Sequence, residues 1–129
     1  MRRPVLLRAG AASTAHAKTL PELMALAADT DGSAVTSLLI LKPAADAAEL
    51  PGSGDTLALW ELLATLGAAD LTAARVVEPH LDAQAILAQA SQLPPASAAQ
   101  RTDFNAGTWG VYAAEGPGMA LQATEHDGA

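Results

Sequence analysis

The sequence predicts a mainly α-helical protein: an N-terminal helical bundle containing a helical hairpin, followed by a short β segment. Three observations predict this class. Leucines recur with helical spacing between residues 55 and 90, breaker residues flank that stretch, and apolar residues alternate between residues 108 and 124. A chain of 129 residues is long enough for one domain of ordinary size. We expect a disordered or targeting tail at 1–18, a helical domain at 19–90, a connector at 91–107 and the incomplete start of a β domain at 108–129.

The first predicted helix runs from Thr19 to Ala28. Thr19 can cap its N-terminus, and Pro21 suits the first turn, where a missing amide hydrogen costs no helical hydrogen bond. One face carries the apolar residues Leu20, Leu23, Met24 and Ala27. Residues 1–16 show no sustained period, so we expect them to fray, with a targeting segment as the alternative.

Residues 34–42 form an apolar stretch that the sequence leaves open between a short helix and a buried strand. Its β-branched residues, Val35, Thr36 and Ile40, favour a strand slightly. Pro43 is expected to end this element at Lys42, because a residue before proline avoids helical angles. A further short helical turn between Ala44 and Leu50 fits the pattern before the PGSGD breaker.

The longest helical pattern, from Asp55 to Ala90, predicts two helices packed as an antiparallel hairpin. Asp55 and Asp70 are the expected N-caps, and Gly67 is expected to mark the end of the first helix. Pro79 predicts a kink or a restart, because proline removes a helical hydrogen bond. The apolar stripes, expected to be buried, contain Leu59, Trp60, Leu62, Leu63, Leu66, Leu71, Ala74, Val77, Leu81, Ile86 and Leu87.

Residues 108–124 show the alternation that is typical of strands. Trp109 and Val111 alternate with small or polar neighbours, and a second alternating run starts at Met119 after a Gly-Pro-Gly turn. A ribbon of two strands is marginally stable by itself. We therefore expect further polypeptide to follow this segment and to complete a β domain.

Charge and composition exclude several classes of function. The formal net charge is -7, and an acidic surface of this kind repels phosphate backbones, so we expect no nucleic-acid partner. The absence of cysteine excludes disulfides, thiolate zinc sites and cysteine nucleophiles, and is compatible with a cytoplasmic location. The apolar run Val35 to Leu41 is far shorter than the roughly 20 residues that cross a bilayer, so we expect no membrane span.

The densest polar cluster consists of Arg75, Glu78, His80 and Asp82, and we interpret it as a solvent-facing helix surface. Arg75 and Glu78 are three residues apart, the spacing of a helical ion pair. His80 and Asp82 are two apart and face away from each other, which excludes a metal-binding pair. The turn at residues 53–56 is interpreted as a helix cap, because it lacks the spacing and the lysine of a phosphate loop. The sequence thus nominates no catalytic residue and no metal ligand.

Two segments, in this order, resemble the acyl-CoA dehydrogenase family of flavoproteins. Residues 51–87, PGSGDTLALWELLATLGAADLTAARVVEPHLDAQAIL, resemble its N-terminal helical domain, and residues 108–128, TWGVYAAEGPGMALQATEHDG, resemble the start of its middle β domain. The usual Thr-Glu-Pro of that β domain stands here as Ala114-Glu115-Gly116, without a following Gly-Ser-Asp. The resemblance therefore implies an FAD cofactor that is contacted through the main chain of Tyr112, Ala113 and Ala114.

The resemblance also implies an activity for the complete protein, namely α,β-dehydrogenation of an acyl-CoA substrate by a homo-oligomer. In this family a carboxylate base removes the α proton and flavin N5 accepts the β hydride. That carboxylate belongs to a C-terminal helical domain beyond these residues, so we expect this chain alone to be inactive. Its residues would shape a wall of the acyl pocket and a contact between subunits.

Two other interpretations come from different classes. The chain could be a small non-catalytic helical module that binds a partner protein through exposed leucines and an open strand edge. It could also be a truncated reading frame without a selected function, which would aggregate when expressed alone. The aromatic residues Trp109 and Tyr112 remain open between packing on the helices and packing on a flavin.

Overall fold

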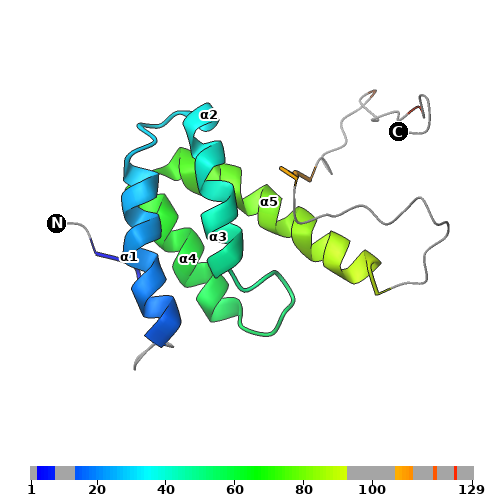
Figure 1. Cartoon of the computed structure of the whole chain (residues 1–129), viewed down its shortest axis with the longest axis horizontal. Helices are drawn as coiled ribbons and strands as arrows, with labels where there is room; N and C mark the ends of the chain where they lie inside the picture. The colour runs from blue at the N-terminus through cyan, green and yellow to red at the C-terminus, as the bar shows by residue number, and fades with distance from the viewer. Residues whose placement is uncertain (1–2, 8–13, 93–106, 112–117, 119–123, 125–129) are drawn as a thin grey trace.

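The computed structural model describes residues 3–7, 14–92, 107–111, 118 and 124, and within residues 14–17 it describes the backbone only (Figure 1). These residues are mainly helical, which confirms the predicted class. Most of the predicted β segment lies outside the described residues, and its described stretch, residues 108–111, has no regular secondary structure. The elements are α1 Thr14–Ala28, α2 Ala34–Ser37, η1 Leu38–Ile40, α3 Leu41–Ala47, α4 Thr56–Ala69 and α5 Leu71–Ala90.

Helix α1 begins at Thr14, so the prediction of an N-cap at Thr19 was wrong. The residues before Thr19 include two alanines, which have the highest helix propensity and extend the helix towards the N-terminus. Pro21 consequently lies inside α1. The predicted apolar face is confirmed, because Leu20, Leu23, Met24 and Ala27 are all buried.

Residues 34–47 form one helical run, in which the 3-10 turn η1 separates α2 from α3. The slight preference for a strand was therefore wrong, and so was the expected end at Lys42. The hydroxyl of Ser33 caps the run by accepting from the amide of Thr36. Because η1 interrupts the α-helical hydrogen bonding, Pro43 occupies the first turn of α3, where proline is tolerated. The helix ends at Ala47, within the stretch where a further turn was expected.

Helices α4 and α5 form the predicted antiparallel hairpin, and both predicted caps are confirmed. The Asp55 carboxylate accepts from the amide of Ala58, and the Asp70 carboxylate accepts from the amide of Ala73 at 2.9 Å. Asp70 also donates its own amide hydrogen to the carbonyl of Leu66, so a single residue ends α4 and starts α5.

Gly67 does not end α4, contrary to the prediction, because the helix continues to Ala69. A Cβ atom at Gly67 would lie 3.7 Å from the Cβ of Ala74, which is an ordinary contact distance, so the packing of the two helices does not require glycine here. The predicted restart at Pro79 was also wrong, since α5 runs through this residue without a break.

The core lies where α1, η1, α3, α4 and α5 meet (Figure 1). Its members are Leu20, Leu23, Ala27, Ile40, Leu41, Ala44, Leu59, Leu62, Leu66, Ala73, Val77 and Leu81. Three residues of the predicted stripes lie on the surface instead, namely Trp60, Leu71 and Ile86. Trp60 follows Leu59 directly, and a step of about 100° around the helix turns it away from the face that Leu59 and Leu62 bury.

Residues 3–7 form hydrogen bonds with two buried side chains of α4. The amide of Val5 donates to Oγ1 of Thr65 at 2.9 Å, and the amide of Leu7 donates to Oε1 of Glu61 at 2.7 Å. Glu61 and Thr65 are both fully buried. The expectation that this stretch frays was therefore wrong. Alternate amides of an extended chain are spaced similarly to residues one helical turn apart, which allows the two hydrogen bonds to form together.

Candidate functional site

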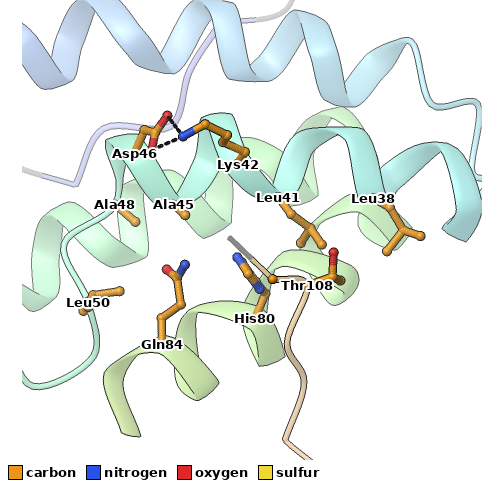
Figure 2. Close-up of a pocket in the computed structure, with 11 residues that line it drawn as sticks. Leu38, Leu41, Lys42, Ala45, Asp46, Ala48, Leu50, His80, Gln84 and Thr108 are labelled. Atoms are coloured by element: carbon orange, nitrogen blue, oxygen red, sulfur yellow. Dashed lines mark hydrogen bonds and ion pairs between the residues drawn. The ribbon is translucent and has the colours of Figure 1, made fainter. Parts of the chain in front are cut away.

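A pocket of about 580 Å³ lies between α3 and α5 (Figure 2). One wall comes from η1, α3 and the residues that follow α3, and the opposite wall comes from His80 and Gln84 of α5. Gly107 and Thr108, which are distant in sequence, form a third side. The pocket therefore combines polar and apolar side chains in one concave surface.

His80 is the most deeply buried polar group of this pocket, with 3% of its surface exposed. It lies one turn beyond Val77 and beside Leu81, on the stripe of α5 that faces the core. The interpretation of His80 as part of a solvent-facing cluster was therefore wrong. Figure 2 shows its ring and the Gln84 carboxamide projecting from α5 towards α3.

The hydrogen bond at His80 determines which of its nitrogens faces the pocket. The backbone amide of Trp109 donates to Nδ1 at 3.2 Å. An amide can donate only to an unprotonated ring nitrogen, so the neutral ring carries its proton on Nε2. Burial lowers the pKa of His80, because the charged ring loses its solvation. His80 therefore presents a neutral Nε2–H donor to the pocket.

The segment 107–111 is shaped by the contact between Gly107 and Trp109. A Cβ atom at position 107 would lie 2.8 Å from the indole ring, which is closer than real contacts of this kind. Only glycine therefore allows the ring to take this position. In the same segment the Trp109 amide donates to His80, and Thr108 lines the pocket.

The α3 side of the pocket is apolar except at its rim. Leu38, Leu41 and Ala45 line it, together with Ala48 and Leu50 further along the chain. Lys42 and Asp46 form an exposed ion pair, with their closest atoms 3.0 Å apart (Figure 2). The two charges offset each other, so the pocket has hydrogen-bonding groups but no net charge from these residues.

The remaining predicted polar residues have ordinary roles. Arg75 and Glu78 form the predicted ion pair on an exposed face of α5. Within the described part of the chain, no group of three histidine, aspartate or glutamate residues could hold a metal ion. The residues predicted to contact FAD, Tyr112, Ala113 and Ala114, lie outside the described residues.

Trp109 packs its indole ring against Gly107 of its own segment, and its backbone contacts α5. The backbone of this segment therefore lies against α5 at residue 109. Sequence reasoning missed the pocket because it considered His80 together with its charged neighbours. The informative signal was the spacing of Ala73, Val77 and Leu81, which places residue 80 at the edge of the buried stripe.

Comparisons with family models, curated proteins and solved structures found no significant match for this chain. No helix of the described residues has the length and apolarity needed to cross a membrane.

Proposed function

We propose that this chain is the N-terminal helical part of an acyl-CoA dehydrogenase-like flavoprotein, together with the first residues of its β domain. One observation carries the proposal: two separate segments resemble that family in the order in which the family has them. These are residues 51–87 and residues 108–128.

Two features of the fold are compatible with this proposal. The first segment includes all of α4 and most of α5, which pack as a hairpin in a helical domain. The second segment begins in a non-helical stretch that lies against α5 through the bond between Trp109 and His80. Both features are also found in unrelated helical proteins, so the support for the function comes from the resemblance.

FAD would supply the hydride acceptor of the proposed reaction, and the proposed contacts are the main-chain groups of Tyr112, Ala113 and Ala114. The described residues do not fit the whole cofactor by themselves. FAD carries a pyrophosphate, whereas the lysine at the pocket rim, Lys42, is already paired with Asp46. The proposed role of this chain is therefore to form a wall of the acyl pocket, without a catalytic residue of its own.

The proposal is tested by expressing the chain together with whatever coding sequence continues it in its own gene. The product is expected to purify with bound FAD and to bleach its flavin absorbance when an acyl-CoA is added. Bleaching by acyl-CoA is specific to dehydrogenation of this substrate class. A product that binds neither FAD nor acyl-CoA would overturn the proposal.

The predicted main-chain contacts are tested in the same flavin-loaded product. Ala113→Pro removes a backbone donor and is expected to weaken FAD binding roughly tenfold, since a hydrogen bond to a bound group is worth about 1 kcal/mol or more. Ala113→Ser keeps the amide and is expected to bind FAD normally. Equal binding by both variants would contradict the main-chain contact while leaving the reaction class intact.

A second candidate function is a non-catalytic helical module that binds a partner protein. The exposure of Leu57 and Trp60, one turn apart on α4, favours it, because large apolar side chains on one helix face suit an amphipathic partner helix. Sedimentation distinguishes the two functions. A flavin-free monomer that forms a defined complex with an unrelated protein, lost in Trp60→Lys, would support the module.

A further inference from the structure

We propose that the pocket between α3 and α5 binds an uncharged carboxamide that carries a short hydrocarbon chain. The inference is independent of the flavoprotein proposal, since it rests on side chains that the described structure brings together.

The donor for the ligand carbonyl is His80. Its Nδ1 is occupied by the Trp109 amide, so the remaining ring donor is Nε2–H. This nitrogen makes no hydrogen bond to another described residue, although His80 is almost completely buried. His80 lines the pocket and its Nε2 is not a fully buried atom, so the oxygen of a ligand in the pocket can act as its acceptor.

Gln84 supplies the complementary groups one helical turn further along α5. Its half-buried carboxamide has no partner among the described residues and can both donate and accept. A ligand carboxamide can therefore accept from His80 through its oxygen and donate to Gln84 through its nitrogen. Figure 2 shows both side chains on the same wall, pointing into the same space.

The charge and the apolar wall select against ionised ligands. Lys42 and Asp46, the charged residues that line the pocket, are paired with each other. An anion would be desolvated without a free cation to compensate it, and an ammonium group would meet the Nε2–H donor of a neutral His80. The hydrocarbon part of the ligand packs against Leu38, Leu41 and Ala45.

The test is an NMR titration of the ¹⁵N-labelled chain with hexanamide at pH 7. We expect saturable shifts of the His80 ring nitrogens and of the Gln84 and Thr108 amides, with a dissociation constant on the order of millimolar for a ligand of this size. Hexanoate and hexylamine have the same chain length but a charged head group, and they are expected to bind roughly tenfold more weakly.

A matched pair of variants distinguishes an effect on the pocket from a general effect of changing a glutamine on α5. Gln84→Leu is expected to weaken hexanamide binding about fivefold, the loss of one neutral hydrogen bond. Gln89→Leu makes the same chemical change at an exposed position outside the pocket, and should leave binding unchanged. The proposal is overturned if hexanamide gives no saturable shifts, if hexanoate binds equally well, or if both variants weaken binding alike. The first two outcomes require no variant to fold.

Discussion

His80 is a titratable side chain held out of water on the core-facing stripe of α5, with one ring nitrogen accepting from the Trp109 amide. Both features favour the neutral ring. Protonation would place a charge in a poorly solvated position and would replace an accepted hydrogen bond with a repulsive contact between two N–H groups. The contact between α5 and the segment 107–111 is therefore sensitive to pH.

The stability of the folded chain is expected to fall as the pH is lowered, because His80 becomes protonated. The pKa of His80 is lowered by burial from the ordinary value of 6.5, so below about pH 6.5 the unfolded chain binds the proton more readily. Its contribution to stability is complete above that pH and is lost as the pH drops towards the folded pKa. The contribution to the slope is at most about 1.4 kcal/mol per pH unit, the value for one proton.

His80→Gln provides the comparison, because glutamine can accept from the Trp109 amide but does not titrate. Urea unfolding of both proteins between pH 5 and 7.5 is expected to show a shallower slope for the variant. The other histidines and the carboxylates are common to both proteins and cancel in the difference. Parallel stability curves would contradict a buried, neutral His80.

At the scale of single elements, the connection between α4 and α5 depends on one residue, Asp70. Asp70→Ala is expected to destabilise the chain by about 1 kcal/mol, because the N-terminal amides of α5 lose their acceptor. Asp29→Ala removes the same charge from an exposed position outside the helices and should change stability much less. Denaturant unfolding measures the free energy of unfolding of both variants. Equal losses of stability would mean that the removed charge, and not the lost cap, determines the effect.

The contact between residues 3–7 and α4 predicts a second element-scale effect. Thr65→Val keeps the shape of the side chain but removes the acceptor for the Val5 amide, leaving that amide without its partner. We expect a loss of about 1–2 kcal/mol and faster hydrogen exchange at Val5. Thr56→Val makes the same change at an exposed position and is the control. Unchanged exchange at Val5 in Thr65→Val would contradict the contact.

Sequence patterns predicted the elements whose causes are local. The caps at Asp55 and Asp70 and the apolar face of α1 depend on neighbouring residues only, and all are confirmed. The misjudged positions depend on distant contacts. Pro43 is tolerated because η1 precedes it, Trp60 faces away from the core that the helices form together, and His80 contacts a segment 29 residues away.

At the scale of the whole molecule, the helices bury one core but leave Leu57 and Trp60 exposed on α4. Trp60→Lys is expected to leave the free energy of unfolding nearly unchanged, because 54% of the tryptophan is already exposed. If another polypeptide covers this face, the variant should reduce association seen by sedimentation. Leu62→Ala, at a fully buried position, is the contrasting change and should cost about 2–5 kcal/mol.

The attachment of residues 3–7 to Thr65 and Glu61 also affects how the chain can be shortened. The hydrogen bonds join positions that are 60 and 54 residues apart, so buried polar groups of α4 bind a segment that precedes α1. A version starting at Thr14 would keep every helix and still lose the Val5 and Leu7 amides that donate to Thr65 and Glu61. Removal of the residues before α1 leaves every helix in the sequence and is nevertheless expected to lower the free energy of unfolding.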